Sequence, residues 1–322
     1  MNELKLGNLT LPYPIIAAPL AGVSDKAYRR VLKESGVPLL FTEMVSAKAL
    51  AYKNPKSEEL VAIAGEKHPI GMQLFGRDPG EIAEAGAYLE SIGADVIDFN
   101  IGCPAPKIVK NQEGSALLKE PELAVSILDR LVRSVKVPVT LKVRMGFKEG
   151  EHDALPLIQG AAAVGIQGVF VHARYREQYY SGTADWSYIR KVKESVDIPV
   201  IGNGDVTDPM KAVALLEQTG CDGILIGRGF LGNPFLYQEI VGFLDTGVYR
   251  KTSVEERLIT ALRQLDYAVL DKGEAIAVRE MRKHLGWYLK GLRGSAIHRN
   301  ALNKAMTQRE MKAILESINI HS

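Results

Sequence analysis

Runs of apolar, often β-branched residues alternate with segments of helical periodicity from Tyr13 to about Phe243. Short apolar runs bounded by turn residues are typical of buried strands in a parallel sheet. The pattern predicts eight strands, at Ile15–Pro19, Leu39–Met44, Ile70–Phe75, Val96–Ile101, Val139–Arg144, Gly168–His172, Val200–Gly204 and Gly223–Ile226. Polar caps followed by proline or an acidic residue predict helices that include Lys26–Lys33, Ile82–Ser91 and Met210–Gln218.

Eight strand–helix units match a TIM barrel better than an open doubly wound sheet, which is the alternative. A weak internal repeat supports the barrel, because Ser134–Val139 recurs as Ser195–Val200 and each copy opens a strand. We therefore predict a (β/α)8 barrel over residues 1–245.

The strand pattern stops after Gly247, and only helical periodicity follows. Ser253 and Glu256 have the spacing of a capping box that opens a helix to about Leu270. Further helices are predicted at Glu274–Leu289, Ala296–Asn303 and Thr307–Ile318. We expect a linker at about 244–252 and an all-helical domain over residues 250–322.

Composition narrows the class of protein. The chain has two cysteines, no secretion leader and no apolar run of membrane-spanning length, so we expect a cytoplasmic protein. The net charge of +2 is unevenly distributed. From Arg250 onward there are fourteen Lys and Arg against eight Asp and Glu, whereas the preceding part has twenty-six against thirty. A basic C-terminal part indicates a nucleic-acid partner, although a solvated basic face would look the same.

Cys103 follows the predicted fourth strand, between Gly102 and Pro104. In a barrel this is the end where chemistry takes place, and a turn can direct the sulfur toward a ligand. The alternative is that Cys103 is a small buried apolar residue.

The loops after the predicted seventh and eighth strands are rich in glycine, at Asn203-Gly204-Asp205 and Gly227-Arg228-Gly229. These two loops commonly bind phosphate in barrels, where backbone N–H groups and an arginine meet the anion. Gln73, Lys142, Arg144 and His172 fall at the same end. Lys142 needs a partner because a buried unpaired ammonium is costly. A Schiff-base role for Lys142 and a purely structural role for His172 are alternatives.

Flavin mononucleotide (FMN) would use both sets of residues, with its phosphate at the glycine loops and its ring beside Pro19-Leu20-Ala21. Lys142 near the ring would favour the negative charge of reduced flavin. We predict no metal site.

In its motifs and their order, the chain resembles the tRNA-dihydrouridine synthases, most closely the B-type bacterial enzymes. The resemblance runs nearly end to end, through Ala17–Asp25, Phe41–Met44, Gln73–Gly76, Asp98–Pro104, Gly114–Leu118, Leu141–Arg144, Val171-His172, Asn203–Asp205 and Gly227-Arg228. The segment Asn100–Pro104 is less specific, because dihydroorotate dehydrogenases have a similar one. Leu20 departs from the pattern, because methionine is common at that position.

The resemblance implies reduction of the C5–C6 double bond of a tRNA uridine, with FMN as cofactor and NADPH as reductant. It places Cys103 as the catalytic proton donor, and it implies FMN contacts from Pro19, Leu20, Ala21, Gln73, Lys142, His172, Asn203, Gly204, Asp205, Gly227 and Arg228. We assign substrate contacts to Asn100, Lys107, Arg144, Arg282 and Lys283.

The chemistry requires an acid that protonates C5 after hydride reaches C6 of the uracil. A thiol of ordinary pKa is mostly protonated at neutral pH, so Cys103 is suited to that step. The segment 105–113 is expected to be a mobile loop over the site, and its lysines Lys107 and Lys110 either contact RNA or are plain surface.

A uridine in folded tRNA must leave its stack to reach a barrel mouth, and the helical domain is the expected grip. Between Arg279 and Lys312 nine Lys and Arg face only Glu280 and Glu310. Of Trp287 and Tyr288, one is expected in the core. Cys221 is expected to be structural. Three alternatives stay open: an rRNA target, a dihydroorotate dehydrogenase-like enzyme and a non-catalytic RNA-binding protein. We expect no DNA or membrane partner.

Overall fold

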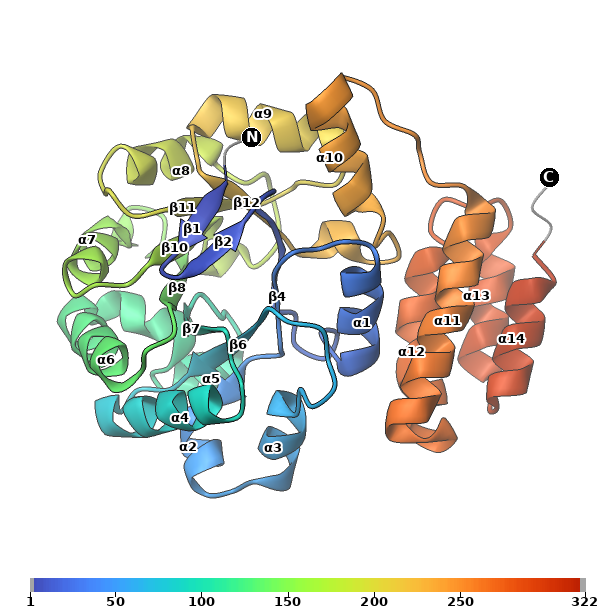
Figure 1. Cartoon of the computed structure of the whole chain (residues 1–322), viewed down its shortest axis with the longest axis horizontal. Coiled ribbons are helices and arrows are strands. Elements are labelled where there is room, and N and C mark those ends of the chain that lie inside the picture. The colour runs from blue at the N-terminus through green and yellow to red at the C-terminus, as the bar shows by residue number, and fades with distance from the viewer. Residues whose placement is uncertain (1–2, 319–322) are drawn as a thin grey trace.

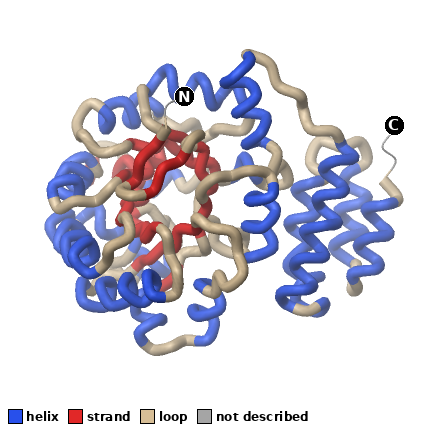
Figure 2. The backbone as a smooth tube through the Cα atoms, viewed as in Figure 1, coloured by secondary structure: helices blue, strands red, loops and turns tan. Residues whose placement is uncertain are grey.

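A closed ring of parallel strands forms the centre of the computed structural model, which describes residues 3–318 (Figures 1 and 2). Its eight strands are β3 (Ile15–Ala17), β4 (Leu40–Phe41), β6 (Ile70–Phe75), β7 (Val96–Ile101), β8 (Val139–Lys148), β10 (Gly168–Tyr175), β11 (Val200–Asn203) and β12 (Gly223–Ile226). Neighbouring strands pair in chain order, and the ring closes where Ile224 of β12 lies opposite Ile15 of β3. The predicted TIM barrel is confirmed.

Several predicted strands differ from the structure in extent. Of the strand expected at Leu39–Met44 only β4 (Leu40–Phe41) forms; a separate strand β5 (Val45–Ser46) follows it, and both pair with β6. The first strand ends at Ala17 rather than Pro19, because proline has no N–H to continue a ladder. An extension of β8 pairs with β9 (Glu151–Asp153) as an antiparallel hairpin that the sequence pattern did not reveal.

Helices surround the ring, and the capping residues identified in the sequence start several of them. The barrel helices are α1 (Lys26–Glu34), α2 (Ala47–Ala51), α3 (Pro55–Val61), α4 (Pro79–Ser91), α5 (Pro106–Lys110), α6 (Pro121–Ser134), α7 (Leu155–Ala163), α8 (Trp186–Lys193), α9 (Pro209–Thr219) and α10 (Leu236–Thr246). The Asp25 carboxylate accepts from Tyr28 N at 2.9 Å, and Asp78 and Asp208 cap α4 and α9 in the same way. The expected helix starts are confirmed.

A short antiparallel hairpin, β1 (Leu4–Leu6) and β2 (Leu9–Leu11), fills the amino-terminal end of the barrel. Leu4, Leu6 and Leu11 are buried against the lowest inward-facing side chains of the ring, among which Phe41 and Phe170 meet edge to face. In Figure 1 this hairpin lies across the ring. The lower end of the barrel is therefore filled by apolar packing.

Four helices after Gly247 form a separate layer with its own apolar core: α11 (Val254–Lys272), α12 (Glu274–Tyr288), α13 (Ser295–Lys304) and α14 (Gln308–Glu316). The capping box of Ser253 and Glu256 is present. The expected linker is shifted, because α10 continues to Thr246 and α11 begins at Val254. No helix within residues 3–318 is long and apolar enough to cross a membrane.

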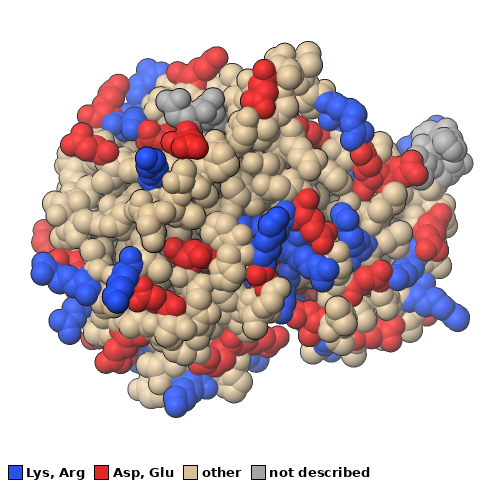
Figure 3. All heavy atoms as spheres, in the orientation of Figure 1, with Lys and Arg blue, Asp and Glu red and all other residues tan. Residues whose placement is uncertain are grey.

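The helical layer packs on α1 of the barrel through Ala27, which is buried in the apolar core of the layer, and through charged and polar contacts. Lys272 pairs with Asp25 at 2.7 Å, and the Tyr267 hydroxyl donates to Glu34 at 2.8 Å. Figure 3 shows basic and acidic side chains gathered over this junction. Charge of both signs at the contact holds the helices beside the barrel mouth.

Candidate active site

A cavity of about 470 Å³ opens at the carboxyl ends of the barrel strands. Its size falls within the range of small-molecule sites. The cavity brings together every residue that we expected to contact FMN, and also Asn100, Cys103 and Arg144. Residues scattered from Pro19 to Arg228 in the sequence thus meet in one place, because parallel strands end at the same edge.

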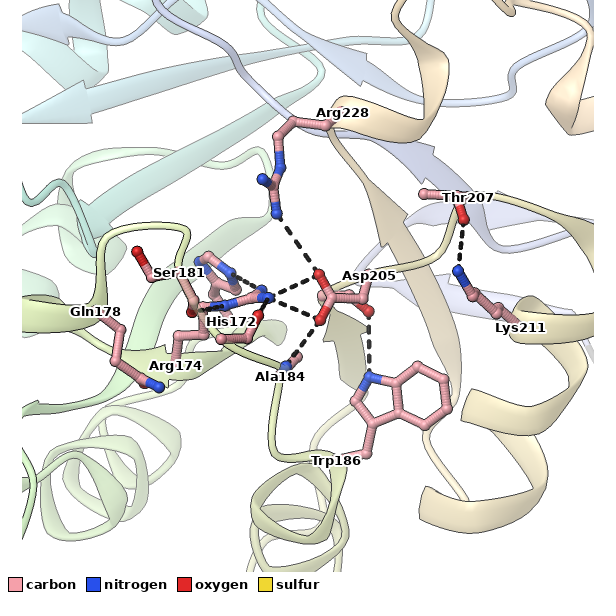
Figure 4. Close-up of polar contacts among 12 residues, drawn as sticks. His172, Arg174, Gln178, Ser181, Ala184, Trp186, Asp205, Thr207, Lys211 and Arg228 are labelled. Carbon is pink, nitrogen blue, oxygen red and sulfur yellow. Dashed lines mark hydrogen bonds and ion pairs between the residues drawn. The ribbon is translucent and has the colours of Figure 1, made fainter. Parts of the chain in front are cut away.

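One side of the cavity, which we call the arginine end, is lined by Asp205 and Arg228, and buried Arg174 pairs with Asp205 there (Figure 4). Arg174 is buried, and its Nη2 donates to both Asp205 oxygens at 2.8 and 2.7 Å. Arg228 approaches the same carboxylate from another direction at 3.5 Å. Burial alone would raise the pKa of Asp205, but hydrogen bonds from Arg174 and Ala184 N outweigh it and lower the pKa.

Asp205 is thus committed to protein groups, and its backbone has a left-handed φ of 59°. Its geometry suits orientation of Arg228 rather than contact with an anion. The preceding Gly204 has φ 144°, and a Cβ there would lie 2.5 Å from Ala184 Cβ, so only glycine fits. Lys211 of α9, which sequence reasoning missed, also lines this end and donates to Thr207 at 2.9 Å.

The middle of the cavity carries Lys142 and His172. Burial, helped by Arg144, lowers the pKa of the Lys142 ammonium to about 8. Burial and the nearby cations lower the pKa of His172 well below its usual value, so the imidazole is neutral at pH 7. Asn203 donates its amide to Leu225 O at 2.6 Å. This stretch offers one cation and several neutral polar groups to a ligand.

The opposite side, which we call the thiol end, contains Gln73, Asn100 and Cys103. The Asn100 Oδ1 accepts from Gly102 N at 3.0 Å and from Cys103 N at 2.8 Å, which forms an Asx turn around the cysteine. Burial raises the pKa of the Cys103 thiol, against weaker opposing effects that include Arg144 and Lys142. The thiol is therefore protonated at neutral pH.

Arg144 stabilises this turn through hydrogen bonds to backbone carbonyls. Its Nε donates to Gly102 O at 2.8 Å, and its Nη1 donates to the carbonyls of Tyr175 and Tyr179 at 3.0 and 2.8 Å. Tyr179 has a left-handed φ of 50°, an uncommon conformation for a bulky residue, and exposed Tyr180 follows it at the cavity wall. The segment 105–113, expected as a loop over the site, contains the short helix α5.

Three expected substrate residues lie outside the cavity lining. Lys107 is exposed on α5. Arg282 donates to Ala305 O at 3.0 Å within the helical layer, and Lys283 donates to Gly22 O of the loop after β3. Lys290, in the turn after α12, does line the cavity. Of the aromatic pair, Tyr288 is the core residue, and Trp287 packs edge-on against His284.

Three comparisons with known proteins bear on the family. The sequence model described as Dihydrouridine synthase (Dus) matches residues 15–321. The chain belongs to the dihydrouridine synthase family. A "Probable tRNA-dihydrouridine synthase" of Rickettsia conorii is 43% identical over 303 residues, which cover 93% of this chain and 91% of that protein. The "tRNA-dihydrouridine synthase B" of Pseudomonas aeruginosa is 38% identical and covers 94% and 92%.

A solved structure confirms the fold independently of close sequence similarity. Histamine dehydrogenase from Rhizobium sp. 4-9 matches with a TM-score of 0.61 at 14% identity, over 82% of this chain and 50% of that one. The predicted family, its B-type resemblance and the oxidoreductase class are confirmed by the relatives. As a dihydrouridine synthase, this chain has its candidate active site where a barrel enzyme requires it.

Proposed function

We propose that this dihydrouridine synthase uses FMN and NADPH to reduce a uridine of tRNA. The observation that carries the proposal is a single cavity with a cationic end, a polar middle that contains the Lys142 ammonium, and a protonated thiol. The names of the relatives supply tRNA as the substrate class. Free cysteines and a tRNA substrate support a cytoplasmic location.

The cavity residues fit FMN. Arg228, steadied by Asp205, and Lys211 offer two cations to a phosphate at the arginine end. Gln73, Lys142 and His172 offer polar atoms to the ring, and Pro19, Leu20 and Ala21 offer a flat apolar wall. When bound there, FMN supplies hydride to C6 of the uracil. Lys142 would stabilise negative charge on the reduced ring.

Cys103 acts as the general acid at C5. Its raised pKa keeps the proton on sulfur, and the Asx turn of Asn100 holds the thiol toward the cavity. Arg144 fixes the turn through Gly102 O, so we assign it a part in positioning in addition to the substrate contact expected from sequence. Tyr180, exposed at the wall, offers a stacking surface to a base or ring.

We assign RNA binding to the helical layer. The proposed domains are thus a catalytic domain over residues 1–245 and an RNA-binding domain over residues 250–322. Lys283 lies on α12, and Lys290 lies in the turn that follows the end of this helix. Lys283 contacts the loop after β3, and Lys290 reaches the cavity, so the path between these two lysines leads from the helical layer to the mouth. Phosphates along it would be neutralised in a salt-dependent way.

The deciding experiment is reconstitution. Purified protein should carry FMN and, with NADPH and unmodified tRNA, should form dihydrouridine at a defined position that sequencing of the modified RNA identifies. NADH in place of NADPH establishes the preferred reductant. A matched reaction with rRNA distinguishes the alternative target, and flavin-bound protein that modifies neither RNA would refute the proposal.

A further inference from the structure

Asp98 is a buried carboxylate on β7 that the proposed chemistry does not use. It lies beneath the cavity, flanked in register by Gln73 of β6 and Thr140 of β8. Gln73 Nε2 donates to Asp98 Oδ2 at 2.6 Å, and Thr140 Oγ1 donates to Asp98 Oδ1 at 2.7 Å. A buried carboxylate is costly unless its neighbours all donate to it, and here they do.

The contact with Gln73 continues to the catalytic turn. Asn100 Nδ2 donates to Gln73 Oε1 at 2.8 Å, and Asn100 Oδ1 accepts from Gly102 N and Cys103 N. A chain of hydrogen bonds thus joins Asp98 to the backbone of the cysteine through two side-chain amides. We call it the amide chain.

The direction of the amide chain is not free. Each side-chain amide could be rotated by half a turn, which exchanges its oxygen and nitrogen. The far end consists of two backbone N–H groups, which only donate, so Asn100 must present its oxygen there. Gln73 must then accept from Asn100 with its oxygen, and its nitrogen needs an acceptor below.

We propose that Asp98 is a positioning residue that fixes the direction of the amide chain and thereby holds the turn of the Cys103 thiol. The inference rests on the proposed function and adds to it a group two side chains away from the reaction. Burial raises the pKa of Asp98 to about 7, opposed by its two donors and Lys142. A role that needs only an oxygen lone pair toward Gln73 tolerates either charge state.

Two isosteric substitutions test the direction. In Asp98→Asn the amide can still present its oxygen to Gln73, because its nitrogen can donate to the Thr140 hydroxyl. In Thr140→Val the carboxylate still accepts from Gln73. Each single variant should therefore keep the chain and retain dihydrouridine formation within about threefold of wild type.

The double variant Asp98→Asn/Thr140→Val removes that freedom. With valine beside it, the asparagine must either leave its nitrogen without an acceptor or turn it toward Gln73, which reverses the chain against Gly102 N and Cys103 N. We expect kcat to fall about tenfold beyond the product of the two single effects, with the KM for tRNA unchanged. Unfolding midpoints and flavin content identify any variant that merely misfolds.

A second readout is independent of turnover: alkylation of Cys103 by iodoacetamide at fixed pH, in flavin-free and flavin-bound protein. The double variant should react severalfold faster than either single variant, because a loosened turn exposes the thiol and removes the burial that raises its pKa. Additive effects in both assays would overturn the inference, as would Asp98→Asn alone being as impaired as the double variant. Lack of dihydrouridine formation by wild type would refute the function, while alkylation would still test the amide chain.

Discussion

The two ends of the cavity are built from different interactions. At the arginine end, two guanidinium groups share the Asp205 carboxylate, and Arg228 stays half exposed. At the thiol end, two neutral amides connect a buried carboxylate to backbone N–H groups. Charge pairs suit an end that must match a ligand's charge, whereas neutral amides can fix a direction without altering the charge around a proton donor.

The largest effect should follow loss of the acid at the thiol end. Cys103→Ala removes the proton donor but none of the contacts at the arginine end. We expect dihydrouridine formation to fall by about 10²- to 10⁴-fold with FMN retained. Rates of RNA reduction and flavin absorbance measure both effects, and Cys221→Ala, at a buried thiol on the turn before β12, is the matched control. Near-normal activity would refute the acid assignment.

Loss of Arg174 should expose the dependence of the arginine end on charge pairing. Arg174→Leu leaves Asp205 with the Ala184 N–H and the more distant Arg228, and it removes donors to the carbonyls of Ser181 and Gly182. We expect the free energy of unfolding of flavin-free protein to fall by about 3 kcal/mol. Urea denaturation measures it. A loss below about 1 kcal/mol would mean that the pair is dispensable.

Arg228 should affect the ligand more than the fold. Arg228→Gln removes the half-exposed cation, so we expect the FMN dissociation constant to rise about tenfold while unfolding of flavin-free protein changes little. Titration of flavin-free protein with FMN measures the constant. Arg250→Gln, at an exposed arginine that pairs with Glu256, is the control. Equal effects at both arginines would remove the phosphate assignment.

A smaller effect should appear at Lys290, which reaches the cavity from the helical layer. Lys290→Gln should weaken tRNA binding severalfold and reduce the slope of log affinity against log salt by about one. Flavin content should not change. Arg133→Gln on α6, at an exposed arginine paired with Asp129, supplies the control. We prefer Lys290 to Arg282, because Arg282 is engaged with Ala305 O and its loss would disturb the helical layer.

The smallest effect is a shift along the pH axis. Alkylation requires the thiolate, and burial raises the pKa of Cys103 above its ordinary value. The rate of iodoacetamide alkylation should therefore rise at higher pH than for a cysteine in an unstructured peptide. Cys103→Ser gives the background from Cys221. A midpoint below that of the peptide would indicate an activated nucleophile and contradict an acid role.

Local sequence patterns revealed most of the barrel, because parallel strands are continuous apolar runs and their helices begin with recognisable caps. The hairpin of Leu4–Leu6 and Leu9–Leu11 escaped detection, since three-residue strands have too little periodicity. The β8–β9 hairpin escaped for the same reason, because exposed Glu151–Asp153 lacks an apolar pattern.

The site was predictable where a glycine follows a strand, as at Gly204, or where a polar residue interrupts the apolar pattern of a strand, as at Lys142. The role of Arg174 was not predictable, because it depends on a partner that is thirty-one residues away in the sequence and lies just after the neighbouring strand β11. Lys290 reaches the cavity because of where α12 lies. Tyr180 reaches it because of the strained turn at Tyr179. The resemblance identified which residues form one site. The structure shows which of these residues position the others through hydrogen bonds and ion pairs.

The hairpin at the bottom of the barrel has a kinetic consequence. Leu4, Leu6 and Leu11 occupy the lower end, so ligands reach the cavity from the strand carboxyl ends, beside the helical layer. Under the proposed function, the nicotinamide of NADPH and the uracil of tRNA must both approach the same reactive ring through that opening. NADPH and tRNA then bind one after the other at the same site during turnover. Each of the two substrates, when present in excess, inhibits binding of the other.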